Sequence, residues 1–81
     1  MSRKLVKATG LDIDGREYAL TFYEQETARG ATRFSCEVAL DAGDRIILDD
    51  DSMTGLECRV SRLAPATVYS RVLAAKKSEA A

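Results

Sequence analysis

Apolar and polar residues alternate along most of the chain, and a period of two is typical of half-buried β-strands. The alternation on both sides of Asp14-Gly15 predicts a hairpin, with strands at residues 5–13 and 16–24. Asp-Gly suits a type I′ turn, because both central residues of that turn need a positive φ. This register places five apolar side chains on one face of the hairpin: Leu11, Ile13, Tyr18, Leu20 and Phe22.

Three more strands are expected downstream, separated by a tight turn and two polar loops. Residues 33–40 have the clearest alternation, with Cys36 on the inward face. Residues 45–48 are expected to form a short strand, in which three consecutive apolar residues after Arg45 indicate burial on both faces. Residues 56–63 alternate again, with Leu56, Cys58 and Val60 expected to point inward.

The last segment, residues 65–77, fits two structures. Its β-branched and aromatic residues favour a strand, whereas Pro65 at its start, lysines at its end and its apolar spacing also fit a helix. We therefore expect an all-β fold, a small antiparallel barrel or sandwich of about five to six short strands. If residues 65–77 are a helix, it would plug or cover one end of a five-stranded curved sheet. The tail from about residue 77 is expected to fray.

Length and charge narrow the class of protein. The 81 residues form one domain, spanning residues 1–81, and so short a chain gains from pairing, which makes a homo-oligomer or a protein partner the expectation. The net charge of −1 comes from interspersed signs, so general nucleic-acid binding is not expected. No apolar run approaches the roughly 18 residues of a membrane span, and no signal peptide is recognised, which predicts a cytoplasmic protein with free thiols and no membrane contact.

Little in the sequence supports catalysis. The chain has no His, which removes the usual general base near neutral pH, so we expect no enzyme, no cofactor and no metal. Both cysteines are interpreted as core residues rather than nucleophiles. The acidic run Asp49 to Asp51 lacks the alternate spacing of a calcium loop. Its ordinary interpretation is a turn in which Asp50 or Ser52 accepts hydrogen bonds from neighbouring backbone amides.

Two short motifs offer a more specific interpretation. The segment "RGATR" followed by "DDSMTG" resembles the Arg-x-x-x-Arg and Asp-x-Ser-x-x-Gly motifs of PilZ domains, which are small β-barrels that bind cyclic di-GMP. The resemblance implies that Arg29 and Arg33 clamp the phosphates and the guanine base. It also implies a guanine-facing turn at Asp50, Ser52 and Gly55. Arginine suits such a ligand because its planar fork binds phosphate and can stack on a base.

We therefore expect a small non-enzymatic binding or regulatory module, with a PilZ-like cyclic di-GMP receptor as the specific hypothesis. The alternative is a protein-interaction or self-assembling adaptor without a small-molecule ligand. Such an adaptor would meet its partner through an exposed strand edge and outward side chains. The candidates for this role are Tyr23, Arg59, Tyr69 and Arg71.

Overall fold

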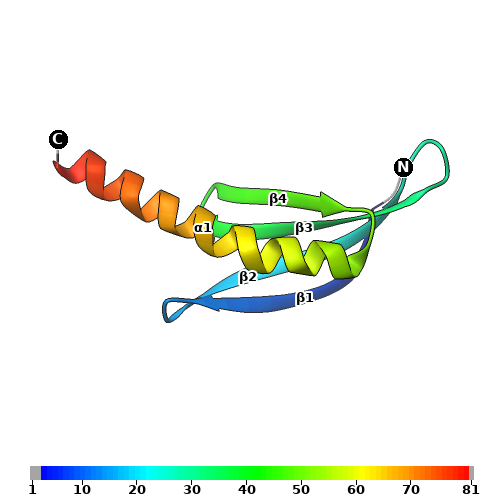
Figure 1. Ribbon diagram of the computed structural model, residues 1–81, viewed down its shortest axis with the longest axis horizontal. Coiled ribbons are helices and arrows are strands. Elements are labelled where there is room, and N and C mark those ends of the chain that lie inside the picture. The colour runs from blue at the N-terminus through cyan, green and yellow to red at the C-terminus, as the bar shows by residue number, and fades with distance from the viewer. Residues whose placement is uncertain (1–2, 81) are drawn as a thin grey trace.

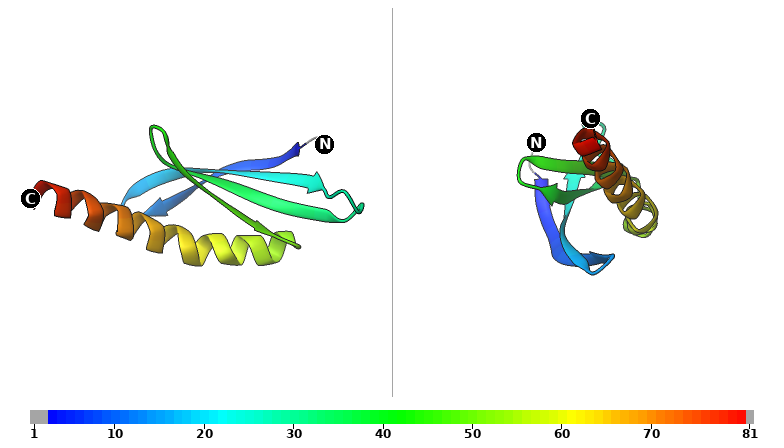
Figure 2. Two further views of the ribbon diagram at one scale, coloured as in Figure 1. Left: turned by 90° about the horizontal axis from the view of Figure 1, so that it is seen from above. Right: turned by 90° about the vertical axis from the view of Figure 1, so that its left-hand side faces the viewer.

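The computed structural model describes the backbone of residues 3–80 and the side chains of residues 3–75. The chain folds into four strands and one helix: β1 (Arg3–Ile13), β2 (Arg16–Glu26), β3 (Thr32–Asp41), β4 (Asp44–Asp50) and α1 (Met53–Ala80) (Figure 1). The strands form one antiparallel sheet in the order β1-β2-β3-β4, so each strand pairs with its neighbour in the chain. The sheet is curved, and α1 lies across one of its faces (Figure 2).

The first hairpin has the predicted register. Leu11 pairs with Tyr18, and Ile13 pairs with Arg16. Asp14 and Gly15 have φ values of 53° and 83°, as a type I′ turn requires. The Asp12 carboxylate accepts a hydrogen bond from the backbone amide of Gly15 at 3.1 Å, which stabilises the turn. The Asp-Gly pair therefore fixes the register that puts the apolar side chains of this hairpin on the helix-covered face.

β3 also agrees with its pattern, whereas β4 does so only in part. Cys36, Val38 and Leu40 are buried beneath α1. Ile46 is half-buried against the same core, but Ile47 is 54% exposed, so the expectation that β4 is buried on both faces was wrong. β4 is an edge strand of a single sheet, and nothing within the described residues covers its second face.

The expected fifth strand at residues 56–63 was also wrong, because these residues belong to α1. Leu56, Val60, Ala64 and Val68 follow one another at intervals of four residues, and all are buried against the sheet. A four-residue interval returns to the same face in a strand and nearly so in a helix, so the two periods agree at these positions. They differ at Cys58, which was expected inside and is exposed.

The fold is therefore mostly β, but it is an open four-stranded sheet and not a closed barrel or sandwich of five to six strands. Of the two structures considered for residues 65–77, the helix is correct. Pro65 lies inside this helix rather than at its start. The helix runs to Ala80, and the fraying expected from about residue 77 stays a prediction.

The core lies between the curved sheet and α1, which packs mainly against β3 and β4. Its fully buried side chains come from both layers, with Val38 and Cys36 from the sheet and Leu56 from the helix. Two charged contacts fasten the helix at its margins. Lys7 of β1 pairs with Glu57 at 2.6 Å, and Arg71 donates a hydrogen bond to Asp44 at 3.0 Å. Both ion pairs are partly exposed, and they join α1 to the two edge strands of the sheet.

α1 is longer than the sheet that it covers. Its 28 residues span about 42 Å at 1.5 Å per residue. Figure 1 shows the orange-to-red end of α1 extending past the strands. The Cα radius of gyration is 14.5 Å, whereas a compact domain of this length would have about 12 Å. The C-terminal end of the helix therefore projects from the domain. We call residues 69–80 the helix extension, within which Arg71 still contacts the sheet at Asp44.

Candidate functional site

The Asp-x-Ser-x-x-Gly motif forms the start of α1. The Ser52 hydroxyl accepts a hydrogen bond from the Gly55 amide at 3.0 Å, and the Ser52 carbonyl accepts the first helical bond from Leu56. Ser52 is therefore the N-cap residue. The Asp50 carboxylate accepts hydrogen bonds from the amides of Asp51 and Ser52. This confirms the interpretation of the segment as a turn capped by Asp50 and Ser52.

Gly55 fits the same arrangement for a steric reason. A Cβ at this position would lie 2.9 Å from the Ser52 hydroxyl oxygen and 3.0 Å from both carboxylate oxygens of Asp50. Such distances are shorter than ordinary contacts between carbon and oxygen, so a larger residue would push the capping groups apart. All three motif residues therefore have a role in starting the helix.

Arg33 lies beside this helix start. Its guanidinium donates a hydrogen bond to Asp49 at 3.0 Å and forms a close ion pair with Asp51. The hydrogen bond to Asp49, with the nearby negative charges, raises the pKa of Arg33 above its usual value. The structure thus brings Arg33 and the second motif together at one end of the sheet. Arg29 is exposed in the β2–β3 loop.

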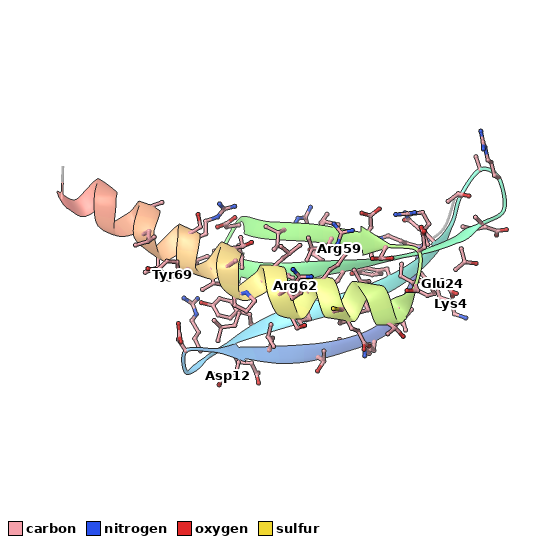
Figure 3. The ribbon with its side chains drawn as sticks, in the orientation of Figure 1. Lys4, Asp12, Glu24, Arg59, Arg62 and Tyr69 are labelled. Atoms are coloured by element: carbon pink, nitrogen blue, oxygen red, sulfur yellow. The ribbon has the colours of Figure 1, made fainter. Side chains whose placement is uncertain are left out.

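The four residues expected to face a partner do not form one surface. Tyr23 lies on the sheet face opposite α1, where the Arg3 guanidinium stacks over its ring at 4.0 Å from the centroid. Arg59 and Tyr69 lie on α1, on the other side of the sheet (Figure 3). Arg71 is bound to Asp44 at the β3–β4 turn. Only Arg59 and Tyr69 share a face.

These two residues belong to a larger exposed surface. Positions spaced three and four residues apart alternately lie on one side of a helix. On α1 this spacing selects a set of exposed residues, which we call the α1 outer face: Arg59, Arg62, Ala66, Tyr69 and Leu73. Tyr69 is 64% exposed and Leu73 is 48% exposed. The surface points away from the buried stripe of the helix.

Sequence reasoning missed Arg62, Ala66 and Leu73 as part of this surface. A signal was available, because the spacing of three and four residues between positions 59 and 73 is a helical period that a strand would not show. It was hidden by the assignment of residues 56–63 to a strand. The α1 outer face could be identified only once these residues were known to form a helix.

An apolar recess lies beneath the beginning of the helix extension. It has a volume of about 220 Å³ and opens between α1 and the ends of the strands. Its apolar lining includes Tyr18 and Leu40 from the sheet with Val68 and Val72 from the helix. Charged residues lie at its margin, where Arg71 already pairs with Asp44. The helix therefore has uncovered apolar side chains on more than one side near residue 72.

The two cysteines lie in different environments. Cys36 is completely buried, and loss of solvation raises its pKa to about 11, with a smaller opposing effect from a backbone hydrogen bond to Thr21. Cys58 is exposed on α1. Among the residues that the structure describes, no cluster of three potential metal ligands occurs. The inward expectation holds for Cys36 alone.

Comparisons with protein-family models, curated proteins and solved structures gave no match. Within residues 3–80, no helix is both long enough and apolar enough to cross a membrane. Function is therefore argued from the two surfaces described above, the α1 outer face and the start of the helix near Arg33.

Proposed function

We propose that this protein is a small non-enzymatic module that assembles with a second copy of itself through the α1 outer face. The supporting observation is the concentration of exposed apolar side chains on α1. Seven large hydrophobic residues are more than about one-third exposed, and four of them lie on this helix: Leu63, Tyr69, Val72 and Leu73. Two of these four, Tyr69 and Leu73, belong to the α1 outer face and lie one helical turn apart. Neighbouring exposed apolar side chains on a small domain mark an interaction site.

The composition of the helix strengthens this argument. Between residues 63 and 75 the only charged side chain is Arg71. A helix that is apolar around much of its circumference is normally buried, because water disfavours every side of it. The sheet covers one side of α1, and the end of the helix extension lies beyond the strands (Figure 1). Association with a second copy would cover the remaining apolar surface.

Size favours the same solution. A chain of 81 residues buries only about two-thirds of the surface that its unfolded form exposes, so additional burial contributes strongly to its stability. The α1 outer face also runs along the helix from Arg59 to Leu73, as an extended partner helix requires. A second α1 offers such a partner without any other component.

Sedimentation equilibrium tests this function. The wild-type chain should sediment at twice its 8.8 kDa mass, and Leu73→Lys should return it to 8.8 kDa, because it adds a positive charge to a face that already carries Arg59 and Arg62. Ile47→Lys is the matched control, since Ile47 has a similar exposure of 54% but lies on β4. The proposal is wrong if the wild type is a monomer up to about 0.1 mM, a limit corresponding to about −5 kcal/mol. It is also wrong if both variants dissociate equally.

Cyclic di-GMP binding is a second candidate, favoured by the position of Arg33 beside the Asp-x-Ser-x-x-Gly turn. An anionic ligand at this place would compete with Asp49 and Asp51 for the guanidinium. Asp51→Asn should therefore tighten binding by removing one competitor, whereas Arg29→Ala combined with Arg33→Ala should abolish it. Calorimetric titration with cyclic di-GMP, using GMP as the control for general phosphate attraction, measures both effects. Absence of heat with the wild type and with Asp51→Asn would reject this candidate.

A further inference from the structure

We propose that two copies pair their α1 helices in antiparallel orientation and cross at Ala66. This inference rests on the proposed self-association and specifies its geometry. The alternating spacing of three and four residues on the α1 outer face is the spacing by which one helix meets another along a narrow seam. Ala66 is the smallest residue of the seam and lies in its middle, with two seam residues on each side. A small residue at that point lets the two helices approach closely.

Charge distinguishes the two possible orientations. In a parallel pair, Arg59 and Arg62 of one copy would lie near the same arginines of the other, and the acidic segments Asp49–Asp51 would lie at the same end. Like charges in such proximity repel. In an antiparallel pair, the two acidic segments lie at opposite ends, and the arginines of one copy lie away from those of the other. The helix dipoles are then also opposed, which is the favourable arrangement.

The same geometry gives the arginines of the seam a partner. With the crossing point at Ala66, residues whose numbers add up to about 132 lie at the same height in the two helices. Arg62 then lies opposite Tyr69 of the second copy, and twofold symmetry repeats this contact. An arginine over a tyrosine ring is attracted by the ring face. This chain already uses that contact where Arg3 stacks on Tyr23.

Leu73 lies at one end of the seam. With the crossing at Ala66, it lies opposite Arg59 of the second copy. The aliphatic stem of an arginine can cover an apolar side chain while its guanidinium stays in water. Arg59 is exposed, and its guanidinium is 3.9 Å from Asp50, on the helix-start side of the residue. The seam therefore has an apolar residue or a stacking contact at each position without burying an unpaired charge.

Disulfide trapping tests the orientation. Cysteines are introduced singly at positions 59, 66 and 73 in a Cys58→Ser background, which removes the exposed native thiol and leaves the buried Cys36. Under mild oxidation, Ala66→Cys should link to itself, because position 66 lies on the symmetry axis. Arg59→Cys alone and Leu73→Cys alone should stay at 8.8 kDa on a non-reducing gel. An equimolar mixture of these two, after subunit exchange, should give a band at twice that mass.

The outcomes separate this inference from the proposed function. Self-linking of Arg59→Cys and of Leu73→Cys, with no additional product in the mixture, would mean a parallel pair and would overturn the orientation while leaving self-association intact. Absence of any linked product, including Ala66→Cys, together with a monomeric wild type, would overturn both. A wild-type dimer in which Ala66→Cys does not link would place the interface elsewhere and overturn the crossing at Ala66.

Discussion

Replacement of Leu56 by Ala tests the packing of the helix on the sheet. Leu56 is completely buried, and it is the largest of the fully buried side chains. The substitution removes three carbon atoms, and at about 0.8 kcal/mol per buried methylene the lost transfer free energy is about 2.4 kcal/mol. The cavity that remains adds to this loss, which gives a destabilisation of about 3–4 kcal/mol. A domain of this length has a total stability of only about 4–12 kcal/mol.

Cys58→Ala is the control that makes this prediction specific. In a strand, Leu56 and Cys58 would face the core together, and both truncations would be costly. In the helix, Cys58 is exposed, so its replacement should change the stability by less than about 0.5 kcal/mol. Urea unfolding followed by far-UV circular dichroism measures both changes. One protein concentration is used throughout, because self-association makes stability depend on concentration.

Val60→Ala is a milder variant that tests the same packing if Leu56→Ala does not fold. Val60 is 3% exposed, and its replacement by Ala removes two carbon atoms. The free energy of unfolding should therefore fall by about 2 kcal/mol. The reasoning would be refuted if Cys58→Ala destabilised the protein as much as Val60→Ala does. It would also be refuted if Leu56→Ala cost less than about 1 kcal/mol, since a fully buried leucine cannot be shortened so cheaply.

Four further predictions concern the helix cap, the first turn and the two thiols. Ser52→Ala should lower the free energy of unfolding by about 1 kcal/mol, whereas Ser70→Ala should change it by less than about 0.5 kcal/mol, both measured by urea unfolding. Gly15→Ala should raise the free energy of the folded state by about 1–2 kcal/mol, seen as a lower Tm, because Gly15 has a φ of 83°. A thiol-alkylating reagent at pH 8 should modify Cys58 in the folded protein and Cys36 only in urea, as mass spectrometry would show. Because the pKa of Cys36 is raised from 9.0 to about 11 on folding, the unfolded state loses this proton first, and stability should fall between these pH values more in the wild type than in Cys36→Ala.

The sheet could be predicted from the sequence because local chemistry and the hydrophobic period agree there. Asp14-Gly15 can form a type I′ turn, and that turn sets the pairing of Leu11 with Tyr18. In β3, the alternation places Cys36 and Val38 inside, where the structure has them. Both elements depend on contacts with neighbouring strands, and the period of two reports these contacts directly.

The helix could not be predicted with the same certainty, because its buried residues satisfy both periods. Leu56 and Val60 are four residues apart, and Cys58 between them completes an apparent strand alternation. Ser52 was expected to accept backbone hydrogen bonds within a turn, but the same hydrogen bonds also start a helix. Pro65 added a further conflict, since proline inside a helix removes a hydrogen bond and is tolerated only when tertiary packing compensates.

The candidate surfaces could also be predicted only in part. Arg33 and the Asp-x-Ser-x-x-Gly motif were identified from the sequence, but their contacts were not. In the structure, Arg33 contacts Asp49 and Asp51, and the motif binds the first amides of α1. Arg59 and Tyr69 were expected to face outward for a strand and do so on a helix. The rest of the α1 outer face depends on helical geometry, so its recognition required the correct element.

The central claim is that the exposed apolar surface of α1 is covered by a second copy. Sedimentation equilibrium of the wild-type chain across a concentration series tests it most directly. We expect a mass of twice 8.8 kDa that falls toward 8.8 kDa on dilution or after Leu73→Lys. A constant mass of 8.8 kDa at every concentration up to about 0.1 mM would contradict the claim.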